Sequence, residues 1–427
     1  MEEDQIFHIP HLNAFSFVQF MRIFAQMDVQ IAQLLGQSAH LLDHVPTGFR
    51  RFLHQDIRWT NRLIGVKGAR GTGKTTLLLQ WLKDQNLPPD KGAYFSLDDL
   101  YFTTFQLKDA VHEFYRSGGK ILVLDEVHKY QNWAQEIKNC HDFYPGLKII
   151  FTGSSIMELS QMTGDLSRRA LMYNLPGLSF REYLLMMGIA DFPRIDLHDL
   201  ISNPHHVKEC IPSEFQPHPH FRNYLQRGTY PYLLEDEEAV HHRIKQLVRT
   251  IVEVDMAEIQ GLDIRNARKL LQLIYIIAQQ VPFKPNLSSL SERTNIHRNS
   301  LNPYLHYLEQ AQLLRLIHPA GNSVATLQKP EKIYLQNTTL LNALASSNVN
   351  AGTIRETFFL DQLTVHHLVN IPKHGDFIVD QTYTFEIGGK RKNKTQIKDI
   401  PQSYNVRDDQ DIPIGNSLPL WYFGLLY

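Results

Sequence analysis

The residues most clearly suited to chemistry form one glycine-rich run, Gly68-Ala69-Arg70-Gly71-Thr72-Gly73-Lys74-Thr75, followed by Thr76. Backbone N–H groups in such a loop can surround a phosphate, and a helix that begins there directs its positive end at the same anion. Lys74 can reach the outer phosphates, and the Thr75 hydroxyl can bind magnesium. The run therefore predicts a site for a nucleoside triphosphate, ATP, together with Mg²⁺.

A pair of carboxylates follows the apolar run Ile121-Leu122-Val123-Leu124. The run predicts a buried strand, which places Asp125 at its carboxyl end, facing the phosphates. A carboxylate there holds magnesium. Glu126 comes one residue later and is the natural general base for an attacking water. The alternative for Glu126 is a solvated loop carboxylate.

Three further side chains are candidates for contact with the γ-phosphate. Thr152 ends another apolar run, where a hydroxyl either senses hydrolysis or caps an ordinary turn. Arg168 and Arg169 offer a positive charge for the transition state, from this chain or from a neighbouring copy. Their alternative role is a structural ion pair with Asp165 or Glu182.

Short apolar runs alternate with helical patterns around these residues, which predicts an α/β fold with a parallel sheet covered by helices on both faces. The strands are expected at 63–66, 93–97, 121–124, 148–152 and 170–173, and the helices at 74–83, 107–117 and 133–143. The P-loop thus follows a strand and opens a helix, which is the context that its chemistry requires. Residues 1–60 form a helical lead-in, and residues 61–190 the P-loop domain.

The remaining chain divides into two or three further parts. Prolines between Asp191 and His220 indicate a linker, which continues as a helical connection to residue 265. Residues 266–345 predict a winged helix, with helices at 267–280, 287–294 and 298–313 and a first wing strand from Leu314. The tail, 346–427, combines a helix at 355–369 with paired strands at 377–379 and 383–387.

Composition limits the classes of partner. The chain has 427 residues, 43% apolar and 20% charged, which is typical of a globular protein of two to four units. Its net charge is −1, so any contact with nucleic acid must be local. The two cysteines, Cys140 and Cys210, lack metal-ligand spacing, and the apolar stretch 270–278 is too short to span a membrane. A cytoplasmic protein is expected.

The chain resembles the bacterial and archaeal P-loop ATPases of the AAA-like superfamily that carry a C-terminal domain of unknown function. The resemblance covers about residue 45 to the end, with specific P-loop motifs and looser C-terminal ones. The matching segments are 68–75, 124–129, 151–155, 178–183, 227–231, 332–335 and 356–359. It implies a glutamate-catalysed ATPase with the Thr152 strand between the P-loop strand and the Asp125 strand.

The resemblance also implies that the tail is a restriction-endonuclease-like remnant. Nucleases of this type place an acid on one strand and Glu-x-Lys on the next, to bind magnesium and activate water. Asp376 and Glu386 fit those positions, and Glu356 could add a ligand. Gly388 stands where the lysine is expected, however, and Lys390 comes two residues later. A binding or structural remnant is therefore favoured over an active nuclease.

The resulting prediction is an ATPase whose hydrolysis cycle drives or switches a C-terminal winged-helix and nuclease-like module. One alternative is a nucleotide-gated DNA-binding regulator with little hydrolysis, which would contact DNA through the helix beginning His297-Arg298-Asn299-Ser300. The other is a metal-dependent nuclease. The physiological protein partner and the oligomeric state are left open by the sequence.

Overall fold

The computed structural model describes residues 29–154, 166, 168–232, 236, 238–256, 267–321, 330–345, 349–389 and 397–427. The first part of the expected lead-in lies outside these residues, as do Asp165 and Lys390. Both ends of the P-loop domain and most of the tail are therefore available for comparison with the sequence.

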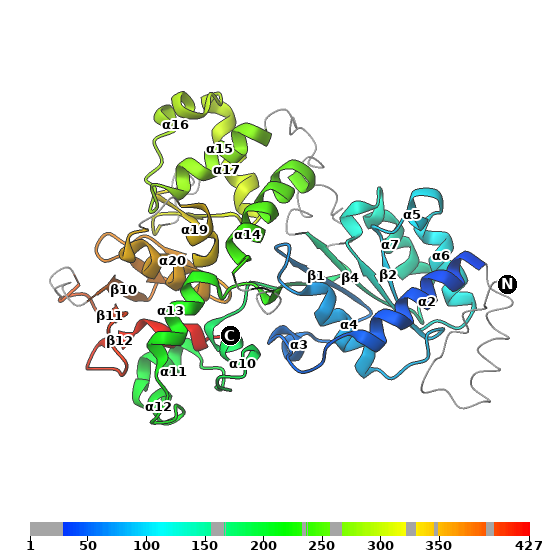
Figure 1. The fold of residues 1–427 in the computed structure, drawn as a ribbon, viewed down its shortest axis with the longest axis horizontal. Coiled ribbons are helices and arrows are strands. Elements are labelled where there is room, and N and C mark those ends of the chain that lie inside the picture. The colour runs from blue at the N-terminus through cyan, green and yellow to red at the C-terminus, as the bar shows by residue number, and fades with distance from the viewer. Residues whose placement is uncertain are drawn as a thin grey trace.

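Five strands form a sheet in the order β2-β3-β4-β1-β5, on the right of Figure 1. They are β1 (Leu63–Gly68), β2 (Gly92–Ser96), β3 (Ile121–Asp125), β4 (Lys148–Ser154) and β5 (Leu171–Asn174). All neighbouring strands of this sheet run parallel. The α/β prediction is confirmed, and the Thr152 strand, β4, lies between β1 and β3 as the resemblance implied.

Alternate residues of these strands enter two separate cores, because successive side chains point to opposite faces of a sheet. On one face, Leu122 and Leu124 pack with residues of α2 (Val29–His44), α6 (Leu107–Arg116) and α7 (Trp133–Phe143). On the other, Val123 packs with α4 (Lys74–Asp84) and α3 (Leu53–Asp56). The short helices α5 (Tyr101–Thr104) and η1 (Val127–Lys129) follow β2 and β3.

The expected linker is helical instead. Within 191–220 the chain forms α11 (Leu197–Ser202) and α12 (Pro204–Glu209) and begins α13 (Pro217–Arg227). The prediction was wrong because the prolines begin helices rather than interrupt them: Pro204 and Pro217 occupy the first helical turn, where a missing N–H costs nothing.

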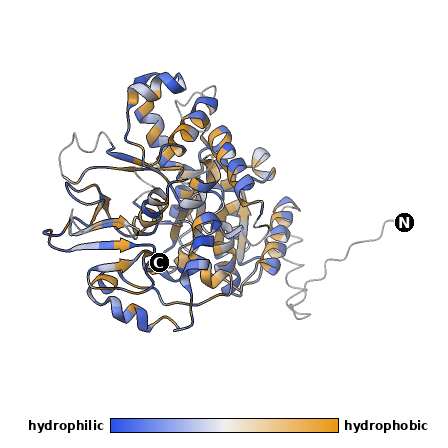
Figure 2. Cartoon of the chain, turned by 60° about the vertical axis from the view of Figure 1, so that its left-hand side comes forward, coloured by the Kyte–Doolittle hydropathy of each residue, from blue (hydrophilic) through white to orange (hydrophobic). Residues whose placement is uncertain are grey.

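The C-terminal half, residues 180–427, is built around one continuous apolar core. Its first elements are α10 (Phe180–Met186), α11 (Leu197–Ser202), α12 (Pro204–Glu209), α13 (Pro217–Arg227), α14 (Val240–Thr250) and the π-helix η3 (Ile251–Asp255). Phe180 and Leu184 of α10 belong to this core. The chain therefore passes from the cores of the P-loop domain to that of the C-terminal half before residue 190, where the P-loop domain was expected to end. Polar and apolar residues alternate around the helices in Figure 2, as amphipathic packing requires.

Three helices and a hairpin follow in the order expected for residues 266–345. They are α15 (Ala267–Ala278), α16 (Leu287–Thr294), α17 (Arg298–Gln310), β6 (Leu314–Ile317), β7 (Lys332–Leu335) and then α19 (Thr338–Leu344). Asn295 turns the chain between α16 and α17 with φ 52°. Strands β6 and β7 pair antiparallel. The helix positions predicted from the sequence are confirmed to within a few residues.

A second sheet of five strands ends the chain, in the order β12-β11-β10-β9-β8. Its elements are α20 (Ala351–Leu363), β8 (Val369–Asn370), β9 (Phe377–Val379), β10 (Tyr383–Gly388), β11 (Ser403–Arg407), β12 (Ser417–Pro419) and η7 (Leu420–Leu425). The expected β9–β10 hairpin is confirmed. The helix predicted at 355–369 instead begins and ends earlier, because residues 364–367 turn the chain into β8.

Candidate nucleotide-binding site

The P-loop connects β1 to α4 as its sequence predicts. Gly71 and Gly73 have φ of 81° and 88°, which favour glycine, and α4 begins at Lys74. Residues of the C-terminal half lie directly against this loop. A Cβ atom at Gly71 would come within 2.7 Å of the Tyr232 ring, and one at Gly73 within 3.5 Å of Pro231. The loop is therefore covered by the segment that follows α13.

The two halves of the predicted magnesium site meet at Asp125. The Thr75 hydroxyl donates to Asp125 Oδ2 at 2.6 Å, and the Asp125 side chain is buried. A third residue, not identified from the sequence, completes this cluster: the Tyr94 hydroxyl of β2 donates to the same oxygen at 2.7 Å. Only its place on the strand next to β3 could have indicated it.

These groups fit a magnesium ion. Mg²⁺ prefers hard oxygen ligands and is usually held by one or two carboxylates, with substrate phosphates and water completing its shell. Asp125 supplies a carboxylate and Thr75 a hydroxyl within hydrogen-bond distance of each other. Among the described residues there is no group of three or more His, Cys, Asp or Glu side chains that could hold a metal by itself.

Glu126 and Thr152 contact the same cluster. The Thr152 hydroxyl donates to Asp125 Oδ1 and accepts from the Glu126 N–H at 3.1 Å. Glu126 itself adopts a left-handed conformation with φ 52°, which turns its side chain out of the line of β3. Thr152 thus joins the Asp125 carboxylate to the backbone at Glu126.

His128 adjoins the Glu126 carboxylate. Its Nε2 lies 3.4 Å from Glu126 Oε2, and its Nδ1 accepts from the Ser154 N–H at 3.3 Å. Burial lowers the pKa of His128 to about 3, so the ring is neutral. A neutral ring that accepts at Nδ1 carries its proton on Nε2, facing Glu126.

Burial also changes the two charged groups nearest the expected γ-phosphate. It raises the pKa of the Glu126 carboxyl, although the Lys74 charge opposes this shift. Burial lowers the pKa of Lys74, although the negative charges of Glu126 and Asp125 oppose this shift. The Lys74 ammonium donates to the Gly68 and Ala69 carbonyl oxygens, both at 3.0 Å. A raised carboxyl pKa suits a general base that must accept a proton.

Further residues at the loop come from distant parts of the sequence. The buried carboxylate of Asp255, in η3, lies 3.1 Å from the Arg70 guanidinium and 3.4 Å from the Lys129 ammonium. Gln312, just after α17, accepts from the Ala69 N–H at 3.0 Å and donates to Asn174 at 3.1 Å. No local pattern in the sequence pointed to either residue.

Arg51 is another buried contact that the sequence did not reveal. It pairs with Glu182 at 2.9 Å and donates to the backbone carbonyl of Thr72 in the P-loop. It also donates to the Pro176 and Gly177 carbonyls, at 2.9 Å each. One guanidinium therefore ties the P-loop to the start of the C-terminal half.

Arg168 and Arg169 do not reach the P-loop of their own chain. They are exposed and precede β5, which runs parallel to β1, so they lie at the opposite edge of the sheet. Arg169 forms an ion pair with Asp142 at 2.9 Å, at the end of α7. The prediction of an arginine acting within the chain is contradicted by this position, and Glu182 pairs with Arg51 instead. A role toward a neighbouring copy stays a prediction.

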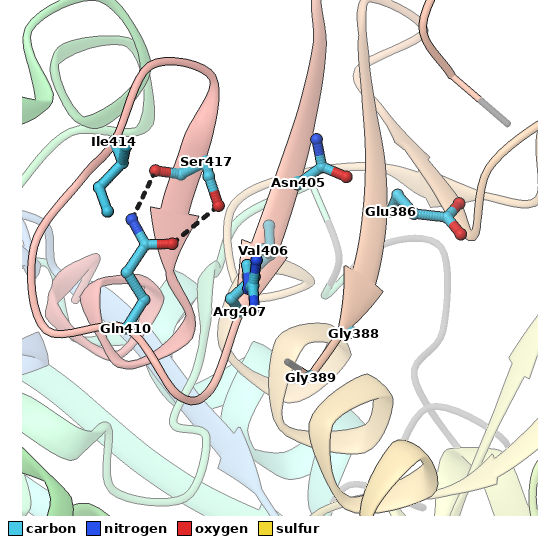
Figure 3. A pocket seen from close by; sticks show the side chains of 9 residues that line it. All are labelled: Glu386, Gly388, Gly389, Asn405, Val406, Arg407, Gln410, Ile414 and Ser417. Atoms are coloured by element: carbon cyan, nitrogen blue, oxygen red, sulfur yellow. Dashed lines mark hydrogen bonds between the residues drawn. The ribbon is translucent and has the colours of Figure 1, made fainter. Parts of the chain in front are cut away.

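The tail brings two of its predicted acids onto neighbouring strands. Asp376 directly precedes β9, and its Oδ2 accepts from the Ile387 N–H of β10 at 2.7 Å. Glu386 is buried on β10 and lines a cavity of about 130 Å³ with Asn405 of β11. In Figure 3 its carboxylate points away from the hydrogen-bonded Gln410 and Ser417.

Glu356 is engaged elsewhere. It accepts from the Tyr334 hydroxyl and lies 3.8 Å from the Lys332 ammonium, both on β7. Both partners lie beside β9, because the Tyr334 ring packs against Phe377 with 6.1 Å between the ring centroids.

Comparison with known proteins agrees with the geometry of the P-loop site. Residues 60–184 match a protein family described as an AAA domain. This segment is therefore similar to AAA domains. Residues 218–351 match a second family, described only as a domain of unknown function, DUF8612. The two matches share no residues, so the P-loop segment and the helical part of the C-terminal half are similar to different families.

One relative spans most of the chain. The uncharacterized protein MJ1637 of Methanocaldococcus jannaschii is 29% identical over 389 residues, which cover 83% of this chain and 81% of that protein. The resemblance therefore extends through both halves.

Similar solved structures include AMPPCP-bound DnaA from Aquifex aeolicus, with 13% identity, TM-score 0.27, and coverage of 61% of this chain and 85% of that one. C. elegans PCH-2 has 16% identity, TM-score 0.24, and coverage of 69% and 71%. Scores this low do not support transfer of function. Separately, no helix among the described residues is long and apolar enough to cross a membrane.

Proposed function

We propose that this protein binds ATP with magnesium at the P-loop and hydrolyses it, and that the nucleotide state switches the C-terminal half. The observation that carries the proposal is the 2.6 Å contact between Thr75 and Asp125, with Glu126 next in the chain. That arrangement supplies a magnesium ligand set and a base at the end of neighbouring strands. A protein that only held nucleotide would not need the base.

In this mechanism the P-loop amides and Lys74 bind the phosphates, and Glu126 accepts the proton of the attacking water. Magnesium, when bound by Thr75 and Asp125, neutralises charge on the phosphates. The Thr152 hydroxyl holds the backbone of Glu126 in place, and the His128 ring lies beside the Glu126 carboxylate. The contacts of Gln312 and Tyr232 with the loop give the C-terminal half a direct means to respond.

Two substitutions test the ATPase assignment. Lys74→Ala is expected to abolish ATP binding in calorimetric titration, because it removes the main cation of the loop. Glu126→Gln is expected to bind ATP with near-normal affinity and to lose at least 100-fold in kcat. Full hydrolysis by the glutamine variant would contradict the role of Glu126.

A second candidate function is a nucleotide-gated DNA-binding regulator. It is favoured by the exposure of His297, Arg298 and Asn299 at the start of α17, the helix that ends two residues before Gln312. A helix presented in this way can enter a groove or contact phosphates, as in winged-helix proteins.

The DNA proposal requires binding that weakens with salt and changes with nucleotide. Fluorescence anisotropy with duplex and single-stranded DNA would measure it. Arg298→Ala is expected to weaken binding several-fold, whereas Arg268→Ala, an exposed arginine on α15, should not. Equal loss in both variants, or no binding at low salt, would exclude a specific role for α17.

A nuclease is less well supported. Asp376 already uses one carboxylate oxygen on a backbone N–H, and Glu356 faces β7. We therefore propose a binding or structural role for the tail. The test is incubation of DNA or RNA with the protein and Mg²⁺ or Mn²⁺. Cleavage that is lost in Glu386→Gln would favour the nuclease over a binding or structural role.

A further inference from the structure

Asp255 is a buried carboxylate placed among the cations of the nucleotide site. It comes from η3 in the C-terminal half, and its side chain is 3% exposed. Its Oδ1 lies 3.1 Å from Arg70 of the P-loop and 3.4 Å from Lys129, which follows the Asp125-Glu126 pair. A single acid from another part of the chain thus neutralises two cations on either side of the phosphate site.

The position of Asp255 is close to where a γ-phosphate would lie. Arg70 belongs to the P-loop, and Lys129 comes three residues after Glu126. The carboxylate that pairs with both cations therefore lies in the region between the loop and the Asp125-Glu126 pair. Within this region, a carboxylate and a γ-phosphate would compete for the same positive charges and repel each other.

We propose that Asp255 discriminates between ATP and ADP by standing beside the γ-phosphate position, an inference that rests on the proposed ATPase function. With ADP bound, Asp255 keeps its ion pairs with Arg70 and Lys129. With ATP bound, the γ-phosphate takes over these cations and displaces the carboxylate. The triphosphate, and not the diphosphate, thereby moves η3.

The movement has a direct path into the C-terminal half. Helix α14 continues into η3 without a break, and the pair packs against α19 and α15. Figure 1 shows α14 beside α19, on the side of the C-terminal half that faces the P-loop domain. A π-helix is a locally strained form of helix that is frequent at functional sites. A shift of Asp255 therefore reaches the helices that precede and follow the predicted DNA-binding helix.

The test compares affinities for ADP and for a non-hydrolysable ATP analogue, both with Mg²⁺, by isothermal titration calorimetry. Asp255→Asn keeps the shape and removes the charge, so the analogue should bind about tenfold more tightly while ADP changes by less than about threefold. Asp255→Ser removes the charge with a different shape and should shift the ratio in the same direction. Glu253→Gln, an exposed carboxylate in the same π-helix, is the matched control and should change neither affinity.

The results separate this inference from the function on which it rests. An unchanged ratio of the two affinities in both Asp255 variants, or weaker binding of the analogue, would overturn the role of Asp255 while leaving the ATPase proposal intact. Failure of the wild-type protein to bind either nucleotide would overturn both. If one variant does not fold, as judged by its thermal melt, the ratio measured in the other decides.

Discussion

At the scale of single residues, Asp125 is the centre of the proposed nucleotide site. Hydroxyl groups of Thr75, Tyr94 and Thr152 all donate to its carboxylate. Each donor comes from a different element: α4, β2 and β4. The carboxylate therefore has one orientation, fixed from three sides before any ligand arrives. Such outer contacts commonly tune metal sites as strongly as the ligands themselves.

Tyr94→Phe tests this arrangement. Loss of the hydroxyl removes one of the two hydrogen bonds to Asp125 Oδ2 and holds the carboxylate less firmly. The concentration of Mg²⁺ needed for half-maximal ATPase activity should therefore rise about tenfold, with a smaller change in kcat at saturating Mg²⁺. Tyr101→Phe, on α5 after the same strand, serves as the control. An unaltered magnesium dependence in Tyr94→Phe would show that Tyr94 only packs beside β3.

Local sequence was sufficient to place the P-loop, Asp125 and Glu126 at the ends of buried strands, because each is a short run next to an apolar segment. Their roles toward a nucleotide stay a prediction. Asp255, Gln312 and Arg51 could not be found in this way. They reach the loop from elements that are distant in sequence, and each is an ordinary polar residue within its own helix or turn. The prediction for Arg168 and Arg169 within the chain was wrong for the opposite reason. These residues are near the motifs in sequence but lie away from the P-loop in space.

At the scale of elements, the alternating strands and helices of the P-loop domain followed from periodicity. Val123 and Leu124 face opposite sides of the sheet, and both are buried, which a continuous apolar run predicts for a parallel sheet. The helices after residue 190 were harder to predict, since proline both ends and begins helices. Strands β11 and β12 were missed because short strands of mixed polarity carry little pattern.

Arg51 shows how elements on either side of the P-loop depend on one guanidinium. Its ion pair with Glu182 is buried, with the two side chains 4% and 1% exposed. Arg51→Met leaves that carboxylate without its cation, so it should cost roughly 3–5 kcal/mol of stability. The adjacent Arg50 pairs with Asp84 at the surface, and Arg50→Met should cost less than about 1 kcal/mol.

Urea denaturation followed by tryptophan fluorescence would measure both variants. The same samples should show weaker ATP binding in Arg51→Met only, because Arg51 also holds the Thr72 carbonyl of the P-loop. Equal stability of the two variants would mean that the buried pair contributes no more than the exposed one.

At the scale of the whole molecule, the C-terminal half contains a buried charge that links stability to pH. Asp361 of α20 lies 3.7 Å from Arg315 of β6. Burial raises the pKa of Asp361 to about 7, although the Arg315 charge opposes the shift. In the unfolded chain the pKa of the carboxyl is about 3.9. At pH values between the two pKa values, the folded state therefore binds the proton more tightly than the unfolded state does. Its contribution to stability is present below ~3.9 and is lost as the pH rises through about 7.

Asp361→Asn should remove that contribution. The free energy of unfolding of the wild type should fall by up to roughly 4 kcal/mol more than that of the variant between pH 4 and pH 7.5. Thermal melts of both proteins at a series of pH values would measure this. The plots of stability against pH should differ in slope between the wild type and Asp361→Asn. Asp380→Asn, an exposed aspartate after β9, is the control. Parallel curves for wild type and Asp361→Asn would contradict a protonated Asp361 near neutral pH.

Tyr427 packs in the core beneath α4, where its ring meets Phe52 at 4.9 Å and its carbonyl oxygen accepts from Ser179. This residue is separated from the P-loop by more than three hundred positions, so the contact forms only after nearly the whole of this sequence has been synthesised. Segments fold from the N-terminus as they emerge, and contacts between distant residues form late. The core of the nucleotide domain is thus completed last, and a nascent chain should acquire its final P-loop packing only when the C-terminal half has already folded.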